Sequence, residues 1–81
     1  MKITVFPNPA TDFVNLEMQV QSNTGYFYQL FDSNGKCLKN EKITSVKSEI
    51  NLIGFARTTY ILNVYSSDQK VLKSFKIIKI N

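Results

Sequence analysis

Apolar and polar residues alternate along most of this chain. In the clearest run, residues 14–20, apolar side chains hold the even positions and polar side chains the odd ones. Because successive side chains of a strand point to opposite faces, this period predicts strands that are buried on one face. Helical periodicity is scarce, so the pattern predicts an all-β protein. Similar apolar-rich runs occur at residues 3–6, 26–30, 36–43, 50–52, 60–64 and 71–80.

Turn-forming residues separate these runs about every ten residues. Polar turns are expected over residues 21–25 and 66–69, and Gly54 closes the short run at 50–52. Asn34-Gly35 is the strongest hairpin signal, because both residues tolerate positive φ. The chain therefore has about seven short strands, with the spacing expected of a β-sandwich.

The last run, residues 71–80, has two interpretations. Lysines recur at every third position from Lys70 to Lys79, which could place them along one broad side of a helix. The late isoleucines and the polar turn before the run favour a strand, because β-branched residues fit strands better than helices. We expect a strand, with a helix as the alternative.

The inward positions of the strands define the expected core. An 81-residue chain with 43% apolar residues can bury such a core as one domain, residues 1–81, but has little room for a deep cleft. We expect this domain to be excised from a longer parent. Its predicted core residues are Val14, Leu16, Tyr28, Leu30, Ile50, Leu52, Tyr60, Leu62 and Val64.

The corner between the first two runs contains two prolines, Pro7 and Pro9. Each fixes its own φ, lacks an N–H and biases the residue before it, Phe6 or Asn8, toward extended geometry. We therefore predict a rigid, extended corner with few ladder hydrogen bonds.

The net charge of +4 comes mainly from lysine, with Arg57 as the only arginine. Nucleic-acid surfaces usually use arginine for bidentate contacts, so dispersed lysines favour a solvated basic face and no nucleic-acid partner. No apolar run approaches the ~20 residues of a membrane span, and we expect no membrane insertion. If the domain is exported, its signal peptide lies upstream.

Candidate catalytic groups are few. Without histidine, the single cysteine Cys37 has no imidazole partner, and no histidine-ligated zinc site can form. Asp32 to Gly35 resembles the start of a calcium loop, but Lys36 occupies the next ligand position. We expect no cofactor, no metal and no enzymatic activity.

Four aromatic residues cluster in one predicted strand: Tyr26, Phe27, Tyr28 and Phe31. They could form a stacking platform for sugars or bases, although such residues are more often divided between a core and an outer face. An accessory β-sandwich that binds carbohydrate or protein at the cell surface is therefore the alternative function.

Several short motifs occur in an order and spacing that resemble one family. The chain looks like a type A C-terminal sorting domain of type IX secretion cargo, the Por secretion tail family, over nearly its whole length. The motifs are Phe6-Pro7-Asn8-Pro9, Val14-Asn15-Leu16, Leu30-Phe31-Asp32 through Gly35-Lys36, Ile50-Asn51-Leu52, Tyr60-Ile61-Leu62-Asn63-Val64 and Lys76-Ile77-Ile78-Lys79.

The resemblance implies an immunoglobulin-like β-sandwich of about seven mainly antiparallel strands that acts as an address. Such a domain follows an upstream cargo domain, passes through the periplasm and engages the type IX translocon and its shuttle components. It crosses the outer membrane to the cell surface or extracellular space. A sortase-like cysteine peptidase then removes it. We expect a monomer or a weak homodimer.

The resemblance also assigns residues. The sorting and recognition positions are Lys76, Ile77, Ile78, Lys79, Ile80 and Asn81, and the structural motif positions are Pro7, Asn8, Pro9, Asn34, Gly35 and Tyr60. We expect the terminal strand to offer unpaired backbone groups at a free edge. Thr58 stands where the family usually has glycine and Phe6 where tyrosine is common, so the bend over residues 56–59 must form without glycine's freedom.

Overall fold

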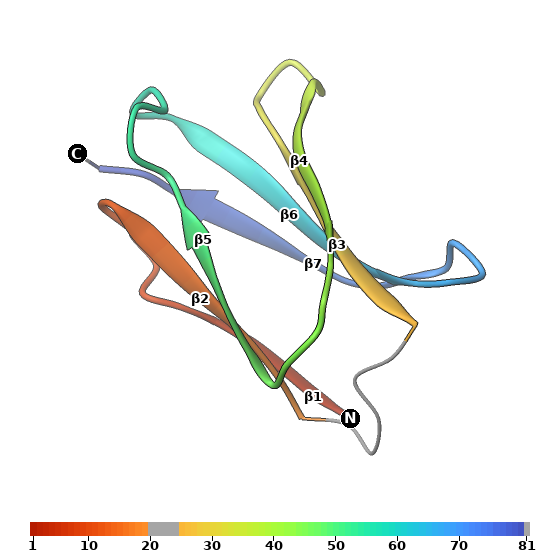
Figure 1. Ribbon diagram of the computed structural model, residues 1–81. Helices are drawn as coiled ribbons and strands as arrows, with labels where there is room; N and C mark the ends of the chain where they lie inside the picture. The colour runs from red at the N-terminus through yellow and green to blue at the C-terminus, as the bar shows by residue number, and fades with distance from the viewer. Residues whose placement is uncertain (20–24, 81) are drawn as a thin grey trace.

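The computed structural model describes residues 1–19 and 25–80, and this part of the chain contains strands and no helix. The last apolar run therefore forms a strand and not a helix, as expected. The turn predicted at 21–25, apart from Gly25, lies outside the described residues, as does Val20. The strands are β1 (Lys2–Phe6), β2 (Phe13–Gln19), β3 (Tyr26–Phe31), β4 (Cys37–Lys42), β5 (Lys47–Asn51), β6 (Thr59–Ser66) and β7 (Val71–Ile78) (Figure 1).

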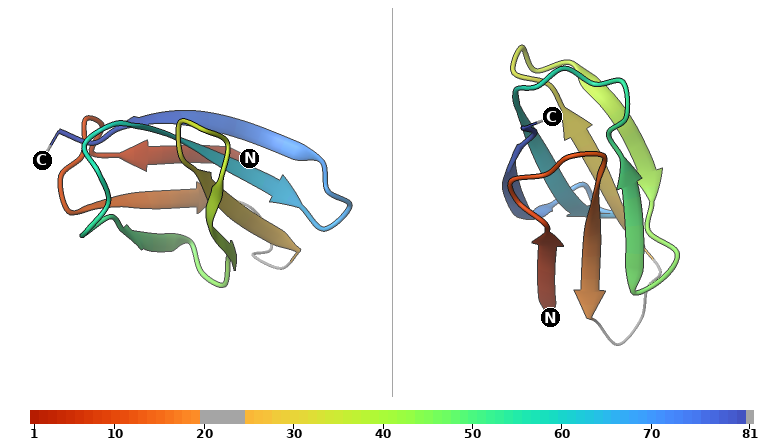
Figure 2. Two further views of the ribbon diagram at one scale, coloured as in Figure 1. Left: turned by 90° about the horizontal axis from the view of Figure 1, so that it is seen from above. Right: turned by 90° about the vertical axis from the view of Figure 1, so that its left-hand side faces the viewer.

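The strands form two antiparallel sheets, one with the order β1-β2-β5 and the other with the order β4-β3-β6-β7. The chain passes to the four-stranded sheet after β2, returns after β4 and passes over again after β5. Figure 2 shows the two sheets as facing layers. Two antiparallel sheets with these crossings make an immunoglobulin-like β-sandwich, as predicted.

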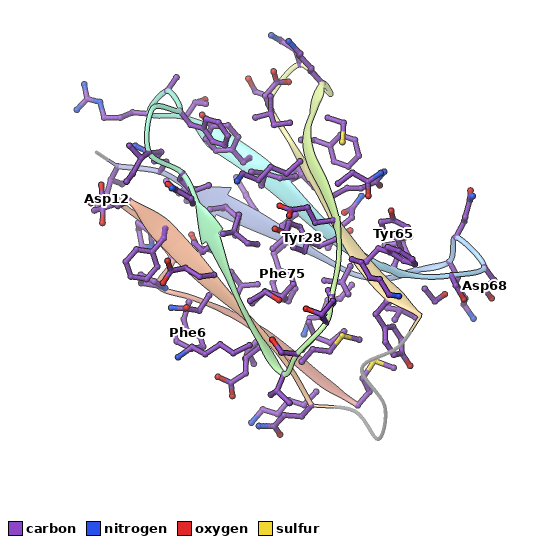
Figure 3. All side chains as sticks on the ribbon, viewed as in Figure 1. Phe6, Asp12, Tyr28, Tyr65, Asp68 and Phe75 are labelled. Carbon is purple, nitrogen blue, oxygen red and sulfur yellow. The ribbon has the colours of Figure 1, made fainter. Side chains whose placement is uncertain are left out.

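The core lies between the two sheets, and all nine predicted core residues are buried there. Tyr28 and Phe75 both point into this interior (Figure 3). Alternation places the apolar side chains of each strand on its inner face, which explains the agreement. The core is larger than predicted, because it also includes Ile3, Ala10, Met18, Ile43 and Ile77.

The β3–β4 hairpin turns where the sequence predicts it, but by a wider loop. Gly35 has a φ of +83°, whereas Asn34 does not have a positive φ. The amide of Gly35 donates to the carbonyl of Asp32 at 3.0 Å, and the amide of Asp32 donates to the carbonyl of Lys36 at 2.9 Å. This is a three-residue loop with glycine in the left-handed position. Of the two residues that tolerate positive φ, only Gly35 adopts it here.

The Asp32 carboxylate stabilises this turn from within. Its Oδ1 atom accepts the amide N–H groups of Asn34 and Lys36, each at 2.9 Å. An aspartate at the start of a turn commonly bonds to the backbone two residues on. The resemblance to a calcium loop therefore has a structural explanation as a capped hairpin.

Replacing Gly35 with valine should lower the free energy of unfolding by about 1–2 kcal/mol, because a β-branched residue must adopt positive φ. A Cβ atom at this position would meet no atom within 4 Å, so the cost comes from the backbone alone. Chemical denaturation measures the effect, with Ser33→Val in the same loop as the control. Equal unfolding midpoints for the two variants would contradict this account.

The bend over residues 56–59 is held by Tyr60, which lies near the start of β6. Its hydroxyl donates to the carbonyl of Ala56 at 2.6 Å. A tyrosine bonded back to the chain just upstream is the tyrosine corner of immunoglobulin-like domains. In the loop before β6, Gly54 has a positive φ of +87°, whereas the φ of Thr58 is not positive. The departure at Thr58 is therefore compatible with the bend. Burial, and next the Asp32 carboxylate, raise the pKa of Tyr60.

Candidate recognition site at the C-terminal strand

The terminal segment, residues 76–80, continues β7 in an extended conformation to the end of the described chain. Its side chains alternate in exposure: those of Lys76, Ile78 and Ile80 are exposed, whereas Ile77 is fully buried and Lys79 is 6% exposed. Asn81 lies outside the described residues. The six expected recognition positions are therefore not equivalent, because two of them point into the sandwich.

One edge of the terminal segment pairs with β6. In the register of the two strands, Ile78 lies opposite Thr59, Ile77 opposite Tyr60 and Lys76 opposite Ile61. Beyond the strand, the amide of Lys79 donates to the carbonyl of Thr58 at 3.1 Å. The segment is thus an integral part of the four-stranded sheet.

The other edge is bonded to the proline corner near the N-terminus. The side-chain Nδ2 of Asn8 donates to the carbonyl of Lys76 at 2.7 Å, and the amide of Ile78 donates to Asn8 Oδ1 at 3.0 Å. One asparagine side chain thereby replaces the donor and acceptor of a neighbouring strand. This role suits a residue placed between Pro7 and Pro9, which have no N–H to donate.

Ala10 continues the same contact with its backbone. Its amide donates to the carbonyl of Ile78 at 2.7 Å, and the amide of Ile80 donates to the carbonyl of Ala10 at 2.9 Å. Ala10 and Lys79 form a parallel bridge, and Ala10 is fully buried. We call residues 8–10 the N-terminal clamp. The Phe6–Pro7 and Asn8–Pro9 peptide bonds are both cis.

Because of the clamp, the terminal segment is not a free edge of the sheet. Four backbone groups of Lys76, Ile78 and Ile80 are bonded to the clamp, while the opposite edge is bonded to β6 and Thr58. The expectation of unpaired backbone groups is therefore wrong for this segment. What the segment does present to a partner is its outward side chains.

Replacing Asn8 with alanine should lower the free energy of unfolding by about 1–2 kcal/mol, because two hydrogen bonds to the backbone are lost. Hydrogen exchange at the Ile78 amide should accelerate more than exchange in the middle of β6. Asn15→Ala is the matched control, since Asn15 lies on β2 and takes no part in the clamp contacts. Unchanged exchange at Ile78 would show that the clamp does not hold the segment.

The two lysines of the terminal segment have different environments. Lys76 is exposed, but Lys79 is buried and takes part in an interaction of its own. Reversing the charge of Lys76 therefore changes the surface, whereas the same change at Lys79 would place a carboxylate inside the sandwich. Lys76 is the lysine whose charge a partner can meet directly.

The other predicted motif positions fall into two groups. Pro7, Asn8 and Pro9 adjoin the terminal segment through the clamp. Asn34 and Tyr60 line one open surface pocket of about 360 Å³. The structure therefore brings the proline motif to the terminal segment, and the hairpin turn to the tyrosine corner.

The aromatic residues of β3 are divided between two faces. Tyr28 is buried and its hydroxyl donates to Glu41 at 2.8 Å, while Phe27 stacks on Tyr65 with ring centroids 5.4 Å apart. Burial, and then the hydrogen bond to Glu41, raise the pKa of Tyr28. The aromatics of this strand therefore do not form one continuous open row.

Within residues 1–19 and 25–80, no cluster of three or more histidine, cysteine, aspartate or glutamate side chains could hold a metal ion. In the same part of the chain, no helix is long and apolar enough to span a membrane. Cys37 is a free, exposed thiol.

The fold and the site define a class of protein: an immunoglobulin-like β-sandwich whose last strand is hydrogen-bonded along both edges and exposes every second side chain of its terminal segment. Residues 4–79 match the family model described as the secretion system C-terminal sorting domain, and the chain belongs to that family. Comparison with curated proteins gave no match. Family membership indicates a type IX secretion sorting signal, which interacts with that secretion machinery and implies export to the cell surface or extracellular space.

Proposed function

We propose that this domain directs an upstream cargo polypeptide from the periplasm across the outer membrane, and that the machinery reads its terminal segment. The family match is the observation that carries this proposal. The structure supports the choice of segment, because Lys76, Ile78 and Ile80 present a lysine and two isoleucines on one side of an ordered strand. Shuttle and translocon components are the proposed partners, and the domain acts without catalysis.

The lysine has a specific part in this proposal. An exposed ammonium group on the recognition surface would attract an acidic receptor and speed encounter. The matched pair Lys76→Glu and Lys2→Glu separates this effect from net charge, since Lys2 is exposed on β1 in the other sheet. Only the Lys76 variant should slow export.

A reporter fused in front of residue 1 tests the proposal. It should reach the medium or cell surface in a type IX-competent host and remain in the periplasm of an otherwise identical host without the translocon. Measurement is by fractionation and immunoblotting. Equal export by both hosts would refute the function.

We further propose that a sortase-like cysteine peptidase removes the domain after export. The released reporter should then be shorter than the fusion by at least the mass of this domain, and it should keep its full length in a host without the peptidase. Mass spectrometry of the exported reporter measures both outcomes. A full-length reporter in the competent host would contradict removal.

A further inference from the structure

The outward side of the terminal segment continues into neighbouring strands as one apolar surface. Across the four-stranded sheet, Phe31 of β3 lies opposite Ile61 of β6, which lies opposite Lys76 of β7. Thr59 lies opposite Ile78. We call this surface the terminal patch: Phe31, Thr59, Ile61, Lys76, Ile78 and Ile80.

The terminal patch is accessible and hollowed. Ile61 is 38% exposed, Ile78 40% and Ile80 54%. An open surface pocket of about 570 Å³ lies between β3 and β6, where Phe31, Thr59 and Ile61 contribute to its lining. An aromatic ring and a branched aliphatic side chain beside a concave surface are typical of places where a partner inserts an apolar side chain.

Charge indicates what kind of partner fits. On the described outward positions of β3 and β6, there is no carboxylate, and the end of β7 adds the ammonium of Lys76. Asp32 also lines the pocket, and its carboxylate accepts two backbone N–H groups. Lys36 follows the pocket residue Gly35 along the chain, so the ammonium groups of Lys36 and Lys76 outnumber this one carboxylate. The patch therefore suits an apolar surface with acidic residues around it.

The outer face of the other sheet lacks this character. Glu17 of β2 lies opposite Lys47 of β5, and Glu49 is two residues further along. The Lys47 ammonium also lies 5.7 Å from the centroid of the Phe6 ring, so one exposed aromatic there already has a cation over it. Mixed charges on that face favour contact with water over a largely apolar partner.

We propose that the terminal patch docks an apolar, acid-rimmed protein surface of the export machinery, so that the sorting signal is a folded surface and not the linear sequence of residues 76–81. The proposal rests on the proposed function and extends it to Phe31, Thr59 and Ile61, which lie outside the terminal segment. A second copy of this chain is a poorer occupant, because two domains of net charge +4 would repel each other and bring their lysines together.

Substitutions at Ile61 test the proposal in the reporter fusion. Ile61→Glu should slow export about tenfold or more, since it removes an apolar contact and repels an acidic rim, while Ile61→Lys should cause a smaller loss. Val71→Glu is the matched control, because Val71 is 52% exposed at the opposite end of β7. Export with the control should be unchanged. Thr59→Glu provides a second variant within the patch if Ile61→Glu unfolds, as judged by its melting temperature.

The outcomes separate this proposal from the proposed function. Normal export of folded Ile61→Glu and Thr59→Glu, with export still blocked by deletion of residues 76–81, would overturn the patch and leave the sorting function intact. A dimer that Ile61→Glu dissociates in sedimentation experiments would instead make the patch a self-interface and would also overturn the proposal. Export that survives both the deletion and the Ile61 variant would place the signal elsewhere in the domain, whereas equal export by hosts with and without the translocon would refute the sorting function itself.

Discussion

Deleting Lys76 through Asn81 should abolish export of an upstream reporter and trap it in the periplasm. The deletion removes all three exposed side chains of the terminal segment, and with them half of the residues of the terminal patch. Cell fractionation followed by immunoblotting measures the effect. Undiminished export of the truncated fusion, in a host where the rest of the domain is still required, would place the signal elsewhere.

The deletion also affects folding, because Ile77 is fully buried and residues 76–78 pair with β6. A second variant separates the two effects: Ile78→Ser with Ile80→Ser keeps Ile77, Lys79 and the backbone bonds of the clamp. This variant should melt close to the original domain and still lose most export. Circular dichroism checks its fold, and normal export of the double serine variant would contradict recognition of these side chains.

Leu62→Ala should lower the free energy of unfolding by about 2–5 kcal/mol, the typical cost of removing a buried leucine side chain. Leu62 is fully buried at the centre of β6, opposite Leu30 on one side and Phe75 on the other. A domain of this size has a total stability of about 4–12 kcal/mol, so the substitution removes a large part of it. Urea denaturation monitored by circular dichroism measures the change.

The neighbouring residue provides the control for this prediction. Ile61 lies next to Leu62 on the same strand but points outward, so Ile61→Ala should cost less than half as much. Similar losses for both variants would contradict the assignment of inner and outer faces. A low cost for Leu62→Ala alone would mean that the core refills the space left by the side chain.

The sequence predicts the strands and most of the core because both depend on local alternation. Leu62 and Val64 are inward for the same reason that Asn63 is not: successive strand residues face opposite sides. Alternation also places Tyr60 in the core, and the hydrogen bond of its hydroxyl to Ala56 is local, four residues away. Local signals of this kind need no knowledge of how distant segments meet.

The clamp could not be predicted in the same way. Asn8 is hydrogen-bonded to Lys76 and Ile78, which lie 68 and 70 positions further along the chain. Neither proline geometry nor alternation predicts a partner at such a sequence separation. Ala10 is buried in the core although no apolar run contains it, and its backbone forms the parallel bridge to Lys79. Lys79, the other partner of this bridge, is also buried, whereas a lysine in an alternating basic run is ordinarily expected at the surface.

The clamp joins the beginning of the domain to its end, and this has a consequence for timing. Because synthesis proceeds from the N-terminus, Asn8 and Ala10 can form these hydrogen bonds only after residues 76–80 have been translated and released. In a cargo protein whose translation stopped early, the N-terminal clamp would have no partner and the terminal segment would be missing. The clamp contacts can therefore form only when the polypeptide has been made up to Ile80. A receptor that requires these contacts would reject incomplete chains.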